Sequence, residues 1–159
     1  AGFGADSARL ALMGYRVTAI ERSPIIVAML QDGLFRACQD KMLAKALGGR
    51  LTVIEANATR WLLNNKGMDV VYLDPMFPPK KKTSPLPPGH IQLLSQIVGS
   101  DIDADQLFFK ARQTGAKRIV VKRPNHSRAL GENPVAIHKG KQVRYEVYKT
   151  QKTNRGSVF

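Results

Sequence analysis

The sequence predicts an α/β protein in which a mainly parallel twisted sheet has helices on both faces. Three observations support this fold class: helical and strand-like segments alternate along the chain, two glycines precede the first expected helix, and residues suited to ligand binding follow several expected strands. Alternation of this kind favours parallel strands joined by covering helices. Two final strand-like segments around a glycine predict a closing antiparallel hairpin.

The expected elements follow from apolar periodicity and from residues that begin or end helices. The longest expected helix covers residues 23–47. Ser23 is its expected N-cap, Pro24 is its first helical residue, and Gly48 follows its end. The other expected helices cover residues 6–13, 59–63, 91–98 and 104–114. The expected strands cover residues 16–20, 51–54, 70–73, 118–122, 135–138 and 143–148.

The chain opens with Gly2 and Gly4, which stand two residues apart just before an expected helix. Glycine lets the backbone approach a nucleotide-like ligand closely, and the N–H groups of a helix amino terminus attract anions. Such a loop normally follows a central strand of the sheet, and no strand-like segment precedes it in this sequence. We therefore expect that the first strand is missing from this chain and that the natural protein extends upstream.

Three further strand ends carry residues suited to a nucleotide-like ligand. Glu21 lies 17 residues after Gly4 and could accept hydrogen bonds from both hydroxyls of a ribose. Asn57 and Ala58 follow the next expected strand, at a position that commonly borders adenine. Asp74 follows the strand after that. Each of these residues could be an ordinary surface group, but together they favour a site along one edge of the sheet.

The segment VVYLDPMFPP, residues 70–79, ends a strand abruptly. Pro75 lacks a backbone N–H and fixes φ, so the strand cannot continue, and Asp74 and Phe77 are held on a stiff turn. In open α/β sheets, ligands bind at this carboxyl edge. We therefore expect Asp74, Pro75 and Phe77 to form a catalytic turn.

Basic residues dominate the second half of the chain. The net charge is +13, and residues 80–159 carry 16 Lys and Arg against 5 Asp and Glu. A single-sign excess of this size favours binding to a polyanion such as a nucleic acid. We expect phosphate contacts from two clusters beside the catalytic turn: Lys80, Lys81, Lys82, Lys122 and Arg123. The alternative, that the lysine triplet is an ordinary solvated loop, stays open.

The sequence gives no signal for a metal site or a membrane span. The three histidines are scattered, Cys38 is the single cysteine, and residues 101–112 lack the Gly and Glu that complete a calcium loop. No apolar run approaches the roughly 20 residues that a membrane span requires. We therefore expect a metal-free cytoplasmic protein, in which Cys38 lies within a helix and contributes to the core.

Several segments together resemble the RsmJ family of bacterial ribosomal RNA guanine-N2 methyltransferases. They are AGFGAD at residues 1–6, ERSP at 21–24, DGL at 32–34, VVYLDPMFP at 70–78, DIDAD at 101–105 and IVVKRP at 119–124. The similarity runs over nearly all of residues 1–148. It implies a Rossmann-like class I methyltransferase fold, S-adenosylmethionine (SAM) as cofactor, and ribosomal RNA or the small ribosomal subunit as partner. Residues 1–149 would form one domain, with a basic tail at residues 150–159.

The resemblance also implies roles for individual residues. The cofactor contacts would be Gly2, Gly4, Ala5, Asp6, Glu21, Arg22, Asn57, Ala58 and Asp74. Among them, Glu21 and Arg22 would lie at the ribose and adenosine, and Asp74 would lie at the methyl donor and the target amine. The pair Asn57-Ala58 departs from the Ser-Ser pair associated with this position in the family, so the adenine-side contacts are the least specific part of the assignment.

The expected chemistry is methyl transfer to an exocyclic amine, without a metal and without a covalent enzyme intermediate. Asp74 and a neighbouring carbonyl could accept the hydrogens of a guanine amine, and Phe77 could stack on an extruded base. Three alternatives stay open: an amino methyltransferase acting on adenine in DNA or other RNA, a nucleic-acid-binding module with a vestigial cofactor site, and a dinucleotide-dependent oxidoreductase. The oxidoreductase gives no reason for the DPMFP turn or for the net charge of +13.

Overall fold

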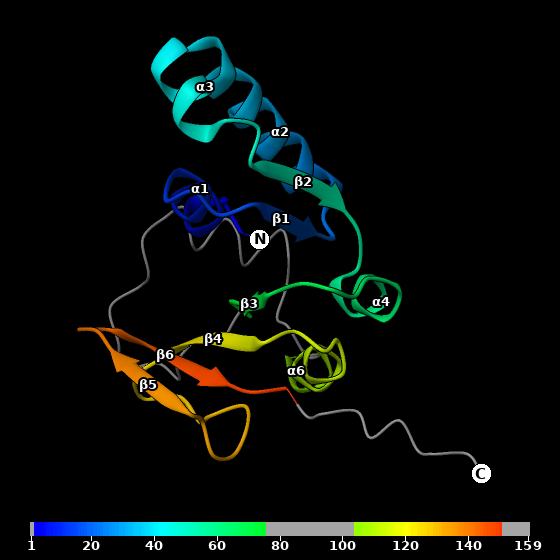
Figure 1. Ribbon diagram of the computed structural model, residues 1–159, viewed down its shortest axis with the longest axis vertical. Coiled ribbons are helices and arrows are strands. Elements are labelled where there is room, and N and C mark those ends of the chain that lie inside the picture. The colour runs from blue at the N-terminus through cyan, green and yellow to red at the C-terminus, as the bar shows by residue number, and fades with distance from the viewer. Residues whose placement is uncertain (1, 76–103, 151–159) are drawn as a thin grey trace. The chain divides into compact units, whose positions relative to one another are not determined.

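The computed structural model describes residues 2–75 and 104–150 (Figure 1). These residues belong to two compact units, one formed by residues 2–58 and the other by residues 59–75 with 104–150, and each unit is described by itself. Within the described ranges, no helix is both long enough and apolar enough to cross a membrane. The expected helix at residues 91–98 lies outside them.

The first unit pairs two parallel strands with three helices. Its strands, β1 and β2, are in register from Val17 opposite Leu51 to Glu21 opposite Glu55. Buried aliphatic side chains from the helices and from β1 form its core: Ala11, Ala19, Ile26, Val27 and Leu47. Its elements are α1 (Ala5–Leu12), β1 (Val17–Glu21), α2 (Pro24–Gln39), α3 (Lys41–Leu47) and β2 (Leu51–Glu55).

The single long helix expected at residues 23–47 is wrong, because Asp40 divides it into α2 and α3. The Asp40 backbone is extended, and its carboxylate accepts hydrogen bonds of 2.9 Å from the N–H groups of Met42 and Leu43. Asp40 is therefore the N-cap of a new helix, a role that short polar side chains fill well. Gly48 ends α3 in the left-handed conformation, as expected.

The second unit contains a four-stranded sheet in the order β3-β4-β6-β5. Strands β3 and β4 are parallel, and β6 pairs antiparallel with both β4 and β5. The predicted α/β fold with a closing antiparallel hairpin is thus confirmed. The elements are α4 (Ala58–Asn64), β3 (Val70–Leu73), α6 (Ala104–Arg112), β4 (Arg118–Pro124), β5 (Ala136–Lys139) and β6 (Val143–Tyr148), with α4 beginning at the last residue of the first unit.

Helices α4 and α6 contribute to the core on one face of this sheet. Leu62 of α4 and Phe108 of α6 pack with Ile119 and Val121 of β4 and with Tyr148 of β6. The rings of Phe108 and Tyr148 meet edge to face, with centroids 4.8 Å apart. Side chains alternate between faces along a strand, so the residues between these core positions, such as Lys122, lie on the opposite face.

Candidate active site

Gly4 is the N-cap of α1 and requires glycine for two reasons. Its φ of 75° lies in the left-handed region, and a Cβ added there would lie 2.6 Å from Cδ2 of Leu30. The first turn of α1 carries the acidic residue Asp6, whose carboxylate pairs with Arg9 at 3.1 Å. Because its N-cap residue is a glycine, this helix has no N-cap side chain to accept hydrogen bonds from its first N–H groups.

Glu21 ends β1 and is 5% exposed. Its Oε1 accepts hydrogen bonds of 2.9 Å from the backbone N–H groups of both Arg22 and Ser23. Burial acts to raise the pKa of Glu21, and these two hydrogen bonds act to lower it. Ser23 is the N-cap of α2 as predicted, although its side chain makes no capping hydrogen bond.

The orientation of α1 places the remaining predicted contacts of the first unit near Glu21. Arg50, just before β2, donates a 3.2 Å hydrogen bond to the carbonyl of Ala11, so the end of α1 lies at the amino edge of the sheet. We infer that α1 begins toward the carboxyl edge, where β1 ends at Glu21 and β2 is followed by Asn57. On this inference one edge would carry Gly2, Gly4, Ala5, Asp6, Glu21, Arg22, Asn57 and Ala58.

In the second unit, Asp74 directly follows β3 and precedes the buried Pro75. Its Oδ2 lies 3.0 Å from Nζ of Lys122, which occupies the neighbouring position on β4. The Lys122 side chain is 24% exposed and that of Asp74 is 44% exposed. On the other side of Lys122, the register places Tyr145 of β6. The sequence predicted both charged residues for the site but did not predict that they pair with each other.

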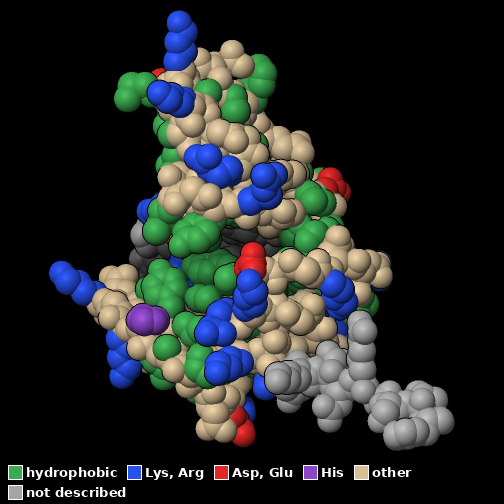
Figure 2. Space-filling model, viewed as in Figure 1, with side chains coloured by type: hydrophobic (Ala, Val, Ile, Leu, Met, Phe, Trp, Pro, Cys, Tyr) green, Lys and Arg blue, Asp and Glu red, His purple; other side chains and the backbone are tan. Residues whose placement is uncertain are grey.

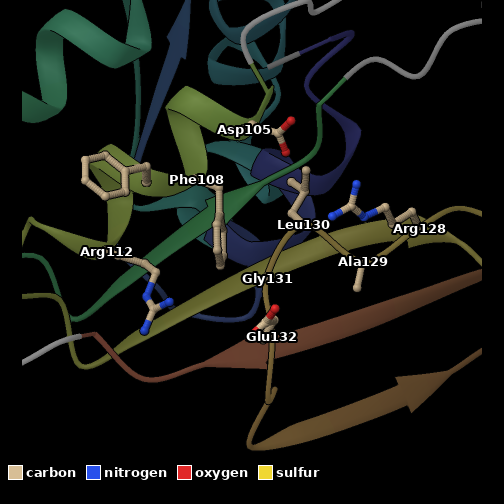
Figure 3. Close-up of a pocket in the computed structure, with 9 residues that line it drawn as sticks. Asp105, Phe108, Arg112, Arg128, Ala129, Leu130, Gly131 and Glu132 are labelled. Atoms are coloured by element: carbon tan, nitrogen blue, oxygen red, sulfur yellow. The ribbon is translucent and has the colours of Figure 1, made fainter.

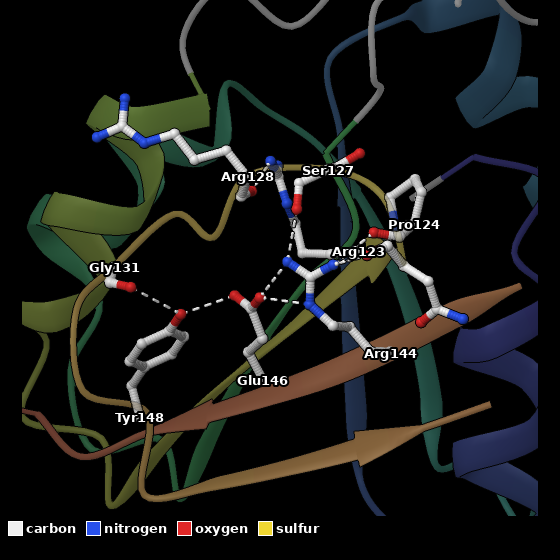
Figure 4. Close-up of polar contacts among 9 residues, drawn as sticks. Arg123, Pro124, Ser127, Arg128, Gly131, Arg144, Glu146 and Tyr148 are labelled. Atoms are coloured by element: carbon white, nitrogen blue, oxygen red, sulfur yellow. Dashed lines mark hydrogen bonds and ion pairs between the residues drawn. The ribbon is translucent and has the colours of Figure 1, made fainter.

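Arg123 was expected to contact RNA phosphates, but it is only 7% exposed. Its NH2 group donates a hydrogen bond to the carbonyl of Arg128, and burial lowers the pKa of its guanidinium (Figure 4). In strand β4 the side chain of Arg123 lies on the face opposite to that of Lys122. The guanidinium of Arg123 is therefore poorly accessible to a phosphate. Its hydrogen bond to Arg128 favours a structural role, in which it holds the loop after β4.

Three alternating residues of β6 form a buried polar cluster beside Arg123 (Figure 4). Nε of Arg144 donates a 2.7 Å hydrogen bond to Glu146, which is 1% exposed, and the Tyr148 hydroxyl lies 2.7 Å from the other carboxylate oxygen. Arg144 also donates to the carbonyls of Pro124, Asn125 and Ser127. The cluster thereby ties the loop after β4 to the sheet.

A cleft of about 530 Å³ opens between α6 and residues 128–132 (Figure 3). Phe108 points toward Gly131, where an added Cβ would lie 2.6 Å from the Phe108 ring, so this position has no room for a side chain. Arg112 and Arg128 lie on either side of Phe108. Nε of Arg112 is buried and has no hydrogen-bond partner in the described part of the chain. No sequence pattern indicated this cleft.

Other predictions lie outside the described residues or need correction. Phe77 and Lys80, Lys81 and Lys82 are outside the described ranges. Cys38 lies in α2 as expected, but it is exposed, so its assignment to the core is wrong. Among residues 2–75 and 104–150, His, Cys, Asp and Glu side chains form no cluster of three that could hold a metal ion, and the metal-free site stays a prediction.

Sequence reasoning missed two features of the site region: the pairing of Asp74 with Lys122 and the buried cluster on β6. A usable signal existed for the second. Arg144, Glu146 and Tyr148 stand two residues apart, so a strand would place all three on one face. Asp74 and Lys122 lie the same number of residues after the first residues of β3 and β4. This equal spacing would have predicted the pair only if the register of the two strands had been known.

Comparison with known proteins gives consistent matches over most of the chain. The model of a SAM-dependent methyltransferase family matches residues 1–150. A relative from Aeromonas salmonicida, named ribosomal RNA small subunit methyltransferase J, is 43% identical over 93% of this chain and 60% of its own length. The relative of the same name from Haemophilus influenzae is 40% identical over 93% of this chain and 58% of its own length. The chain thus spans about 60% of the length of these curated relatives.

Solved structures show the same fold. A SAM-dependent methyltransferase from Neisseria gonorrhoeae is 32% identical, with a TM-score of 0.72 over 98% of this chain and 64% of its own. An rRNA methyltransferase from Streptomyces viridochromogenes has a TM-score of 0.57 over 94% of this chain and 73% of its own, but only 11% identity. At that identity, the second similarity concerns the fold alone.

Proposed function

Because the chain belongs to the SAM-dependent methyltransferase family, we propose that it transfers a methyl group from SAM to the exocyclic N2 amine of a guanine in small-subunit ribosomal RNA. One observation carries the proposal: Asp74 lies at the carboxyl end of β3, directly before a buried proline. The names of the curated relatives support small-subunit ribosomal RNA as the substrate. The excess of basic side chains, many of which are visible in blue in Figure 2, supports a polyanionic partner.

The first unit offers groups that fit the nucleoside of the cofactor. Glu21 is a buried carboxylate that accepts two backbone hydrogen bonds, and a carboxylate can also accept hydrogen bonds from ribose hydroxyls. The first turn of α1 follows the Gly4 turn, and Gly4 provides no capping side chain. We assign cofactor binding to Gly2, Gly4, Ala5, Asp6, Glu21, Arg22, Asn57 and Ala58, and we retain Asp74 as a proposed contact of the cofactor. When bound, SAM supplies an electrophilic sulfonium methyl group.

The protein's contribution at the target is to orient the amine. The lone pair of a guanine N2 amine is delocalised into the ring, so the amine is a weak nucleophile. Asp74 accepts hydrogen bonds from the amine and aligns its lone pair for attack on the methyl group. Orientation of this kind can contribute up to about 7–11 kcal/mol to lowering a barrier. Pro75 restricts the backbone that carries Asp74, because its ring fixes φ.

The remaining RNA contacts are proposals from the sequence. We retain Phe77 as a stacking residue for the extruded base, and Lys80, Lys81 and Lys82 as phosphate contacts. Arg123 is left out of this set because it is buried. A ribosomal RNA substrate would place the protein in the cytoplasm, and we expect neither a metal nor a membrane to take part.

Methyl transfer can be tested with the purified protein, labelled SAM and small ribosomal subunits from a strain that lacks the enzyme. The RNA is digested after the reaction and its nucleosides are separated. We expect the label in N2-methylguanosine, which identifies the donor, the base and the atom together. Naked ribosomal RNA, assayed in parallel, shows whether the assembled particle is the substrate.

Two other outcomes would contradict the proposal. Label in methyladenosine would keep the methyltransferase activity but replace guanine with adenine as the target. Absence of transfer, with SAM still raising the melting temperature, would point to a protein that binds the cofactor but does not methylate this RNA, since any ligand that binds only the folded state stabilises it.

A further inference from the structure

We propose that Lys122 selects guanine over adenine, by acting with Asp74 to read the hydrogen-bonding edge of the target base. This inference rests on the function proposed above and deepens it, because the catalytic turn alone does not distinguish the two bases. It also changes the role of Lys122. The sequence suggested a phosphate contact, whereas the structure pairs its ammonium group with the Asp74 carboxylate at 3.0 Å.

The pair combines opposite hydrogen-bonding characters at one place. An ionised carboxylate only accepts hydrogen bonds and has about four lone-pair sites, whereas a lysine ammonium group only donates and has three N–H groups. Asp74 and Lys122 bring these two characters within 3.0 Å of each other. A base that approaches the pair meets an acceptor and a donor side by side.

Guanine presents the complementary pattern along the edge that carries its N2 amine. Its N2 and N1 atoms carry hydrogens and its O6 is an acceptor, so Asp74 can accept from N2–H and N1–H while Lys122 donates to O6. In adenine the N6 amine is a donor and N1 is an acceptor. Placed in the same way, adenine would turn a donor toward the ammonium and a lone pair toward the carboxylate. Buried polar groups left without a partner in this way give strong discrimination between substrates.

The surroundings of Lys122 favour this role over a phosphate contact. The side chain is 24% exposed, and it lies on the sheet face between Asp74 and Tyr145 according to the strand register. A contact to the RNA backbone is made most easily by an ammonium group that extends from the sheet into solvent. Lys117, at the other end of the same two strands, shows what such a lysine looks like: its side chain is 78% exposed.

The test compares two RNA substrates that both keep the N2 amine. One contains guanosine at the methylated position, mapped in the assay above. The other contains 2,6-diaminopurine riboside there, which replaces the O6 acceptor with an amine and also removes the hydrogen on N1, so it changes the contacts of both Lys122 and Asp74. We expect the wild-type protein to prefer guanosine by about 100-fold or more in kcat/KM. In Lys122→Met, the activity on guanosine should fall roughly 10- to 100-fold while that on diaminopurine stays close to wild type. The preference should therefore shrink by the same factor, and what remains comes from the contact of Asp74 with N1–H.

Control variants separate recognition from folding and from phosphate binding. Lys117→Met removes a lysine from the same pair of strands and should leave the preference unchanged. Lys122→Gln keeps a donor without the charge and should retain an intermediate preference. It also serves as a second variant if Lys122→Met does not fold. The KM for SAM should stay at its wild-type value in both Lys122 variants.

One result would overturn this inference while leaving the proposed function intact: a preference for guanosine in Lys122→Met that is as large as in the wild type. If the logarithmic salt slope of RNA binding is then also smaller by about 1, the lysine is a phosphate contact instead. Failure of the proposed function itself would show earlier, as wild-type protein that places no label in N2-methylguanosine.

Discussion

Strands β3 and β4 are joined by an aspartate–lysine pair at each end, and the two pairs differ in their surroundings. At the amino ends, Lys117 lies 2.7 Å from Asp69, and both side chains are more than three-quarters exposed, at 78% and 77%. At the carboxyl ends, Lys122 lies 3.0 Å from Asp74, with exposures of 24% and 44%. The residue types, the strands and the separations are nearly the same, so the difference lies in the environment.

The comparison shows that position on the sheet, more than the ion pair itself, determines what such a pair can do. An exposed pair is screened by water and salt and contributes little to stability. A half-buried pair at the carboxyl edge of parallel strands lies where α/β proteins bind ligands. The carboxyl end is also backed by the buried Arg144–Glu146–Tyr148 cluster, which holds the loop that follows β4.

The largest expected difference between the two ends is in methyl transfer. Asp74→Ala removes the acceptor for the target amine, so kcat should fall by about 100- to 1000-fold or more, the usual effect of losing a preorganised polar group. Asp69→Ala, at the other end of β3, should leave kcat unchanged. Steady-state assays with labelled SAM measure both variants, and circular dichroism checks that they are folded. Wild-type kcat in Asp74→Ala would exclude the proposed mechanism.

Glu146→Gln tests whether the buried cluster supports the carboxyl end. The substitution keeps the shape of the side chain but leaves the buried guanidinium of Arg144 without its carboxylate. The free energy of unfolding should fall by roughly 3 kcal/mol, near the lower end of the cost of breaking a buried ion pair. Urea denaturation at neutral pH measures this change. If the free energy of unfolding fell no more than in Asp69→Ala, the buried cluster would stabilise the fold no more than an exposed ion pair does.

Tyr148 gives the same cluster a pH dependence. Burial, followed by its hydrogen bond to the Glu146 carboxylate, raises the pKa of Tyr148 from 10.0 to about 12. Because the folded-state pKa is above the ordinary one, the stabilisation is fully present below pH 10 and is lost as the pH rises toward 12. Between pH 8 and 11.5, the free energy of unfolding should fall by about 2 kcal/mol more in the wild type than in Tyr148→Phe, whose side chain cannot ionise. Urea denaturation of both proteins from pH 8 to 11.5 measures it, and parallel curves would contradict it.

The smallest expected effect concerns the exposed pair. Hydrogen bonding to Lys117 lowers the pKa of Asp69, and hydrogen bonding to Asp69 raises the pKa of Lys117. Any stabilisation is therefore present above the ordinary Asp69 pKa of 3.8 and is lost as the pH falls below it. Asp69→Ala and Lys117→Met should leave the melting temperature unchanged in moderate salt. A clear decrease in the melting temperature of either variant would mean that the exposed pair also stabilises the fold, contrary to what its exposure predicts.

Much of the fold followed from local sequence signals, and the misses have identifiable causes. The predicted strand at residues 70–73 is confirmed residue for residue, because its apolar run is bounded by Pro75. The long helix was divided wrongly, because Asp40 was counted as one polar residue on a helical face and not as an N-cap. The assignment of Cys38 to the core failed because a position within a helix does not say which face is covered.

The sequence by itself determined the order of the elements, the left-handed turn at Gly4 and the strand that ends at Asp74, because these depend on the conformational preferences of a few adjacent residues. Only the tertiary structure decided which of the two adjacent cations, Lys122 or Arg123, lies beside Asp74. Lys122 meets an aspartate 48 positions away, and Arg123 turns to the opposite face and is buried. Pairing between strands depends on register and on the alternation of faces, and neither is encoded within one short segment.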